Sequence, residues 1–537
     1  MKKRNAFTLV ELLAVIVILA IVLIIAVPGV LSIINKTKNS AYDRQIDMIK
    51  EATRNYVTTS NQVQWKDNQT VVNLTDLQGQ GLLDKKIINP KDKSEIHGLA
   101  VIVTRSNNKL TYEIVSSDPS NANYPVYNQA MIPIRYDGTN WVKADPTNKN
   151  QTWFDYTKQQ WANVATVTED VRQSLLEAPV DTIVPMDKIN AMLVWIPRFK
   201  YKLFNVDGTV SPVGNANMAG DYMIDVKFEG KETPKSAGTQ NGQWLTHPAF
   251  TFGEQELSGL WVGKFETGNS TATAPTDTSY NYVDATKIVV KPNAYSWKYQ
   301  TTYHIFKNSQ SMKEVSTFGI TSAEDPHMMK NMEWGAMAYL TSSPYGKEGN
   351  PNYSGEEKEV RLNNNENLTG CGADTQNAAG PVATCNQYDT VQGQAASTTG
   401  NITGIYDAVG GSNDYVASIM ENKDGTYIVG KSEFPLSVLE QVIKENKYLD
   451  VYEEKLDVLS IEKRKLGDAT KEMGTITDDA TIGPVSPWRT DRARFITSIT
   501  PWFYRGGSWE IQQRTGIMAY NGYTGQPFNN ASRIVLI

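Results

Sequence analysis

Residues Phe7–Ile34 read FTLVELLAVIVILAIVLIIAVPGVLSII, and almost all of them are Leu, Ile, Val or Ala. A short basic head, MKKRN, precedes this run at Met1–Asn5. A helix of about 28 residues, with a rise of ~1.5 Å per residue, is long enough to cross a bilayer core of ~30 Å. The run therefore predicts an N-terminal transmembrane helix.

Glu11 is the one charged residue inside this run. A lone carboxylate at membrane depth costs about 2.5–3.5 kcal/mol on insertion scales, so its presence points to a function. A secretory signal would have a shorter apolar region with a small-x-small site after it, whereas here the small residue Ala6 comes before the run. The other interpretation is a plain signal anchor that tolerates a carboxylate near its end.

The residues around Ala6 resemble the type IV prepilins, in which a basic leader and a Gly precede Phe-Thr-Leu-x-Glu at the start of a long helix. The resemblance implies cleavage by a prepilin peptidase after Ala6 and methylation of the Phe7 amine. It also implies that Glu11 pairs with the N-terminal amine of a neighbouring subunit in a filament. Pro28 falls where pilin helices carry a kink. Ala6 stands where the family has Gly, which leaves the efficiency of cleavage open.

Composition narrows the classes of protein. The chain has 537 residues, enough for several domains, and 40% of them are hydrophobic, which is typical of a folding chain. The net charge of -6 argues against nucleic acid as a partner. Only 4 His and 2 Cys are present, which excludes a zinc-finger array or an iron–sulfur protein. No cofactor is expected, although a calcium site, which needs only oxygen ligands, stays open.

The first third of the chain predicts a helix followed by short strands. An irregular apolar stripe extends the N-terminal helix over residues 7–60, after a leader at 1–6. Leu99–Thr104 and Leu110–Val115 flank one turn, and Ala130–Tyr136 and Trp141–Ala144 flank another, which is the pattern of two hairpins. We therefore expect a small antiparallel, β-rich, pilin-like region over residues 61–167. Residues 168–185 read as a connector.

Residues 186–537 carry a series of short motifs in a distinctive order. The motifs are a strand pattern at Ala191–Tyr201, a helix pattern at Lys330–Leu340, the segment Ile405–Tyr415, the turn Arg505–Trp509 and a last strand bearing Arg533. In this order they resemble the formylglycine-generating-enzyme-like family, a variant of the C-type lectin fold. Ile405–Tyr415 keeps the frame of the family's segment but lacks both of its Trp residues. The expected fold class is thus α+β, with a long pilin helix and a small sheet before a lectin-like domain.

The catalytic members of that family use a pair of cysteines near the C-terminus that bind copper. Here the two cysteines are Cys371 and Cys385, in a Gly/Ala/Asn-rich loop, and no cysteine follows them. We expect a structural disulfide, since a closed loop of about 15 residues gains ~3 kcal/mol in the chain-entropy model. No catalytic triad or phosphate-binding glycine motif is legible. The protein is therefore expected not to be an enzyme.

The segment Gly516–Ser532 is the predicted ligand-binding face. It combines rigid aromatic rings with adaptable amides and hydroxyls, a mixture that antibody loops also use, although a polar β-turn loop without a ligand has a similar composition. Its predicted binding residues are Trp509, Tyr520, Asn521, Tyr523, Thr524, Gln526, Phe528, Asn529 and Asn530. A second region, the insert Asn363–Gln387, is the alternative location.

The leading hypothesis is a minor type IV pilin or pilin-like protein on the bacterial surface, anchored in the cell membrane by its N-terminal helix. Its lectin-like domain would act as an adhesin for a glycan or a protein. The expected partners are prepilin peptidase, other pilin subunits and the membrane. The alternative is a pseudopilin of a type II secretion or DNA-uptake (competence) machine, and an enzyme displayed on a filament comes third.

Overall fold

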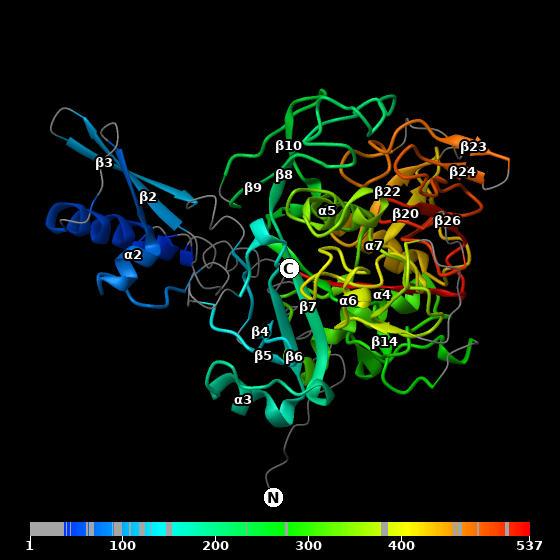
Figure 1. Cartoon of the computed structure of the whole chain (residues 1–537), viewed down its shortest axis with the longest axis horizontal. Coiled ribbons are helices and arrows are strands. Elements are labelled where there is room, and N and C mark those ends of the chain that lie inside the picture. The colour runs from blue at the N-terminus through cyan, green and yellow to red at the C-terminus, as the bar shows by residue number, and fades with distance from the viewer. Residues whose placement is uncertain are drawn as a thin grey trace, which may run out of the picture. The chain divides into compact units, whose positions relative to one another are not determined.

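The computed structural model describes residues 37–537 with internal gaps (Figure 1). The residues left out of the description are 1–36, 39, 43, 61–62, 64–68, 89, 91–98, 107–108, 117–123, 129, 147–152, 232, 274–277, 377–384, 455–458, 460–463, 481–482 and 511–514. The predictions on Ala6, Phe7, Glu11 and the transmembrane part of the helix therefore lie outside the described residues.

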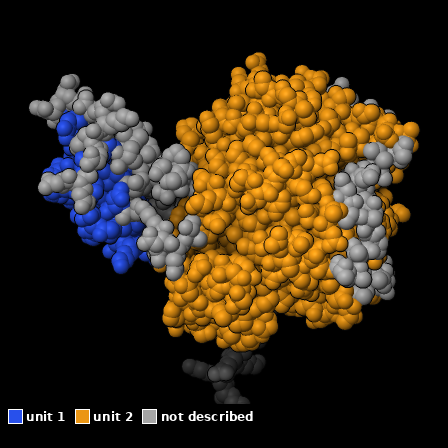
Figure 2. All heavy atoms as spheres, viewed as in Figure 1, with its two compact units in different colours: residues 1–121 blue, residues 122–537 orange. Residues whose placement is uncertain are grey.

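The chain folds as two compact units, Met1–Asn121 and Ala122–Ile537, which Figure 2 draws in different colours. In the first unit, the described residues between 37 and 59 are helical, as expected for the end of the long helix. Three antiparallel strands and a short helix follow. Their bounds are β1 (Gln69–Asn73), α2 (Leu74–Gly79), β2 (Leu99–Ser106) and β3 (Lys109–Ser116).

The sheet of the first unit confirms the first predicted hairpin. Strand β2 pairs with β3 from Leu99 opposite Ser116 to Ser106 opposite Lys109, and β1 pairs with the other edge of β2. Val101 and Val103 alternate along β2 and are fully buried, as the period of two predicts. They share a small core with Ile49 of the helix and Leu77 of α2. The unit thus stacks one helix on one face of a small sheet.

A seven-stranded antiparallel sheet forms the centre of the second unit. In sheet order its strands are β16 (His327–Met328), β28 (Ile534–Leu536), β13 (Gly259–Gly263), β7 (Ile189–Pro197), β6 (Asn163–Val167), β4 (Ile132–Tyr136) and β5 (Trp141–Lys143). Strand β7 reads INAMLVWIP and is buried along almost its whole length, as a continuous apolar run predicts. The C-terminal strand β28 lies inside this sheet.

The boundary between the units differs from the one expected at residues 167 and 168. The second predicted hairpin is present as β4 and β5, but β6 pairs with β7 from Asn163 opposite Val194 to Val167 opposite Ile189. Strands β4, β5 and β6 therefore belong to the second unit and not to the pilin-like region. Their alternation predicts strands but does not say which sheet they join, because a hairpin pattern is local and sheet membership is not.

Smaller sheets surround the central one. They are β26 (Tyr520–Tyr523), β25 (Trp502–Arg505), β19 (Asn413–Tyr415) and β27 (Asn530–Ser532); β10 (Trp244–Thr246), β8 (Phe199–Lys202) and β9 (Val226–Phe228); β21 (Tyr427–Ile428), β20 (Ser418–Glu421) and β22 (Asp450–Glu453); and the pairs β11 (Thr251–Phe252) with β12 (Gln255–Glu256), β14 (Gly268–Asn269) with β15 (Ile288–Val289), β17 (Cys371–Gly372) with β18 (Asn386–Gln387), and β23 (Thr477–Asp479) with β24 (Gly483–Val485). The mixed α+β class is confirmed, with strands more numerous than helices among the described residues.

The helices of the second unit are α3 (Glu169–Glu177), α4 (Thr302–Ser311), α5 (Asn331–Thr341), α6 (Val391–Gln394) and α7 (Leu436–Glu445). Helix α5 confirms the helix pattern predicted at Lys330–Leu340. Every residue of α5 is buried, so the helix runs through the core. At Gly335 a Cβ atom would lie 1.9 Å from Gly467 O, and only glycine allows this close approach.

A buried ionic network connects the motifs that the sequence placed in order. Arg533, on the turn into β28, donates from Nε to Asp414 Oδ2 of β19 over 3.1 Å, and both side chains are almost completely buried. Glu266 accepts a hydrogen bond from Ser412 N, and Asp407 accepts from Gly370 N. Burial raises the pKa of Asp414 to about 6, even though the charge of Arg533 acts in the opposite direction. Arg533 thus offsets part of the negative charge of Asp414, Asp407 and Glu266.

Candidate ligand-binding pocket

The predicted ligand face divides into a buried half and a partly exposed half. Among its residues, Tyr520, Asn521, Asn529 and Asn530 are buried. Trp509, Tyr523, Thr524 and Gln526 are half-buried, and Phe528 is 45% exposed. The tyrosine ring of Tyr523 lies 5.2 Å from the ring of Phe528.

Tyr520 belongs to the core of the second unit and cannot serve as a surface contact. Its ring lies 5.4 Å from the guanidinium of Arg505 and 5.6 Å from that of Arg464, in cation–π geometry. Asn530 is equally structural, because its Oδ1 accepts a hydrogen bond from Asn413 Nδ2. The prediction that Tyr520 binds ligand is therefore wrong, since strand β26 turns this residue inward.

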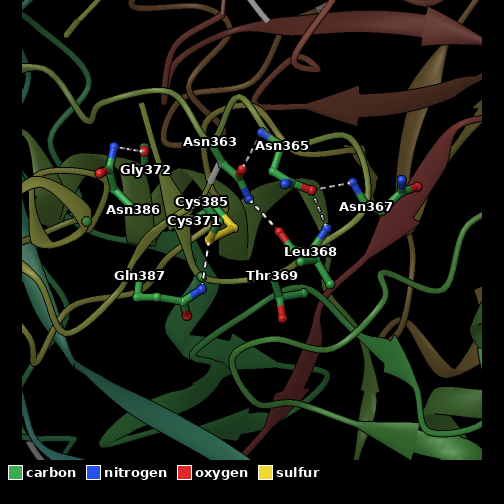
Figure 3. Close-up of a disulfide and its surroundings, with 12 residues drawn as sticks. Asn363, Asn365, Asn367, Leu368, Thr369, Cys371, Gly372, Cys385, Asn386 and Gln387 are labelled. Atoms are coloured by element: carbon green, nitrogen blue, oxygen red, sulfur yellow. Dashed lines mark hydrogen bonds between the residues drawn. A yellow bond between two sulfur atoms is a disulfide. The ribbon is translucent and has the colours of Figure 1, made fainter. Parts of the chain in front are cut away.

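Cys371 and Cys385 are joined by a disulfide, with 5.0 Å between their Cα atoms (Figure 3). Strands β17 and β18 pair beside the bond, with Cys371 opposite Gln387. The preceding loop is held by a series of asparagine side chains: Asn363 Nδ2 donates to Leu368 O, and Asn365 Oδ1 accepts from Leu368 N (Figure 3). The disulfide and these amides fix one wall of the insert Asn363–Gln387.

A pocket of about 700 Å³ opens beside this insert. Most of its lining comes from the loop at Asp221 and Tyr222, the segment from Glu348 to Glu359, and the turn at Arg489 and Thr490. Gln376, from the insert, and Thr515, which packs over Gly507 of the Arg505–Trp509 turn, also line it. The pocket thus includes a residue of the insert Asn363–Gln387, the alternative ligand-binding region predicted from the sequence.

Charged side chains of both signs line the pocket. Arg489 Nη2 donates to Glu348 Oε2 over 2.8 Å, and Lys358 Nζ lies 3.9 Å from the other oxygen of the same carboxylate. The guanidinium of Arg489 also lies over the ring of Tyr222 at 4.4 Å. Arg489 is thus held by a carboxylate and an aromatic face at once, a rigid arrangement that suits recognition.

A second pair of acids lies behind Arg489. Burial and then the charge of Asp491 raise the pKa of Glu359 well above its usual range. Burial raises the pKa of Asp491 to about 7, although the hydrogen bond from Met518 N and the charge of Arg489 both lower it. The pKa values of both carboxyl groups therefore lie above the usual range, and the charge of Asp491 disfavours the negative charge of Glu359.

The backbone at the pocket is strained. Arg489 and Thr490 both have positive φ, 48° and 60°, which a β-branched residue such as threonine rarely adopts. Such outliers persist where the surrounding structure forces them and concentrate at functional sites. The following residue, Asp491, anchors the turn because its Oδ2 accepts from Met518 N over 3.1 Å.

The amino-acid sequence did not predict this pocket. Glu348 and Arg489 are 141 residues apart, and neither belongs to a recognisable motif. The one available signal was the acidic segment Gly355–Glu359, which reads GEEKE between turn residues. Charge runs of this kind are usually solvated faces, so the segment alone did not predict a site.

Comparison with known proteins bears on the N-terminus. Residues 1–27 match the family model of the prokaryotic N-terminal methylation motif. The N-terminus is therefore type IV prepilin-like, and the motif indicates a pilin-like or pseudopilin-type protein that is processed by prepilin peptidase and assembles with other pilins. No curated protein matches the chain.

Among the residues that the structure describes, no helix is both long and apolar enough to cross a bilayer. The same part of the chain contains no group of three or more His, Cys, Asp or Glu side chains placed to hold a metal ion.

Proposed function

We propose that this chain is a surface-displayed minor type IV pilin, or a pilin-like protein, whose second unit binds a ligand without turning it over and so mediates adhesion. The match of residues 1–27 to the N-terminal methylation motif carries the pilin-like part of the proposal. The size of the second unit supports a minor or tip position, because residues 122–537 are too bulky to repeat along every subunit of a thin packed fibre. The resemblance to lectin-like domains remains part of this proposal.

The charged pocket is the proposed ligand site of the second unit. Arg489 and Lys358 both lie against Glu348, and burial raises the pKa of Glu359, so the exposed acids left to act on a ligand are Asp221 and Glu356. Both are exposed at the rim. Carboxylates at the rim attract a cationic group. We therefore expect a protein ligand whose surface presents a basic side chain to the pocket.

The test uses the full-length chain displayed on bacteria and a host-protein and glycan array. The variant Asp221→Asn with Glu356→Gln removes both rim charges, and Glu254→Gln, an exposed acid outside the pocket, is the matched control. If the double variant loses binding to the array and the Glu254→Gln control keeps it, the result supports the pocket as the ligand site. Unchanged binding by the displayed double variant overturns it.

The rival function, a pseudopilin of a secretion or DNA-uptake machine, predicts a different phenotype. Deletion of the gene would then abolish export or transformation and leave adhesion unchanged. A deletion strain that loses adhesion and keeps both export and transformation supports the adhesin.

A further inference from the structure

A second pocket, of about 500 Å³, lies on the sheet of the second unit, where strands β4, β5 and β6 meet the turn at Ile402 and Thr403. The strand register places four of its lining residues, Ile134, Tyr136, Trp141 and Asn163, on one face. Tyr136 of β4 lies opposite Trp141 of β5, and Asn163 of β6 lies opposite Ile134 of β4. Because directly paired residues point to the same side of a sheet, the three strands present one common wall.

Tryptophan rings form the floor of this pocket. Trp141, Trp153 and Trp161 are each at least 95% buried, and each indole N–H is used inside the protein. Trp141 donates to Tyr388 OH over 3.1 Å, Trp153 to Asn163 O over 2.8 Å and Trp161 to Tyr345 O over 2.8 Å. The rings are thus fixed and present only carbon edges. The half-buried ring of Tyr136, 5.5 Å from that of Trp141, is the aromatic surface open at the rim.

Asn163 supplies an oriented acceptor. Its Nδ2 donates to Trp161 O and to Thr403 O, both over 2.9 Å, so a flipped amide would place its oxygen against two carbonyls. Asn163 Oδ1 is buried and has no hydrogen-bond partner among the described residues. A buried acceptor left unsatisfied needs an explanation, and an ordered water is one of them. We infer that a ligand hydroxyl can take the place of that water.

The charges at this rim are already paired. Lys158 Nζ lies 2.8 Å from Asp155 Oδ2, and the side chain of Arg135 is paired with Asp181. Gln160, exposed at the edge, adds an amide that both donates and accepts. The pocket therefore selects for hydrogen bonds and an apolar surface and not for charge, in contrast to the pocket at Arg489.

We propose that this pocket binds a neutral saccharide residue. Sugar hydroxyls can donate to Asn163 Oδ1 and exchange hydrogen bonds with Gln160, and the C–H face of the ring can pack on Tyr136 over the indole floor. The site is separate from the charged pocket, and it does not depend on the filament role.

The experiment is saturation-transfer NMR on the full-length chain in detergent, with glucose, galactose, mannose and N-acetylglucosamine as probes at millimolar concentration. The variants are Tyr136→Ala and Gln160→Ala. The matched controls are Tyr427→Ala, a half-buried tyrosine of β21, and Gln240→Ala, an exposed glutamine on another loop. Thermal unfolding of each variant checks that it is folded.

At least one of these sugars should give a signal with the wild type and both controls, weakened tenfold or more in Tyr136→Ala. If Tyr136→Ala does not fold, the exposed Gln160→Ala variant decides, with an expected weakening of several-fold. Absence of any signal with all four sugars, or signals unchanged in the folded pocket variants, overturns the proposal. Saccharide binding by a chain that never enters filaments would overturn the proposed function and leave this site standing.

Discussion

The two units differ in how their function is encoded. In the first unit, the informative residues are neighbours in the sequence. The motif of residues 1–27 indicates that the protein is processed by prepilin peptidase and assembles with other pilins. In the second unit, the side chains that meet are far apart: Glu348 and Arg489 by 141 residues, Trp141 and Tyr388 by 247. A short motif can be recognised from the sequence alone, whereas a pocket exists only after folding. The comparison predicts that changes in the first unit abolish assembly and changes in the second alter stability or binding.

Glu11→Ala is the change with the largest expected effect. It should leave membrane insertion intact or improved, because a costly carboxylate is removed, yet it should abolish filament assembly, because the amine of the adjoining subunit loses its partner at low dielectric. Immunoblots of membrane and sheared-filament fractions measure both. Glu51→Ala, an exposed acid on the described part of the helix, is the control. Wild-type levels of the Glu11→Ala chain in filaments would show that the charge-pair argument is wrong.

Arg533→Met tests the buried network of the second unit. Removing one partner of a buried ion pair typically costs about 3–5 kcal/mol, because the remaining charge is left uncompensated. Asp414 would be that charge, together with Glu266 and Asp407 nearby. Denaturant unfolding measures the loss, and Arg533→Met combined with Asp414→Leu should recover part of it. A single variant as stable as wild type would contradict the role of Arg533.

Replacing Cys371 and Cys385 with Ser has a smaller expected effect. The chain-entropy model gives about 3 kcal/mol for a loop of this length. The asparagine hydrogen bonds of the adjoining loop remain, so the second unit should stay folded and displayed. Unfolding with and without reductant measures the change. Free thiols at both positions in the folded, secreted protein would refute the disulfide.

The sequence predicts individual strands and helices in both units. It does not predict which strands pair with one another in the folded sheets. The hairpin at β2 and β3, the pair β4 and β5, and the helix α5 follow from alternation, turn residues and helical spacing. The assignment of β4 to the pilin-like region failed because its partner β6 pairs with β7, and pairing is a tertiary property.

Tyr520 shows the same limit at the level of a single residue. Its neighbours are Asn, Gly and Tyr, a composition typical of an exposed turn, yet strand β26 pairs it with Arg505 of β25 and buries it. The sequence also gave no sign of which charged residues are buried. Lys347 is fully buried and donates to two backbone carbonyl oxygens, at Glu359 and Ala395, although lysine is almost always exposed.

Asp491→Asn has the smallest expected effect and concerns pH. The pKa of Asp491 in the folded protein, about 7, is raised above the usual value of about 4. The folded state therefore holds a proton that the unfolded state releases, so this contribution to stability is complete below about pH 4 and is lost as the pH rises through 7. Lys347, whose pKa burial lowers to about 7, acts in the opposite sense above that pH. Unfolding at about pH 5 and about pH 8 should show a shallower fall in the Asn variant than in wild type. An equal fall in both would exclude Asp491 as a titrating group.

N-terminal mass spectrometry of surface material tests the central claim most directly. The prepilin-like motif predicts a mature chain that begins at Phe7 with a methylated amine, so the leader Met1–Ala6 should be absent. A chain with Met1 intact, or one cut beyond Ile34, would contradict the pilin assignment and with it the proposed display of the second unit on a filament.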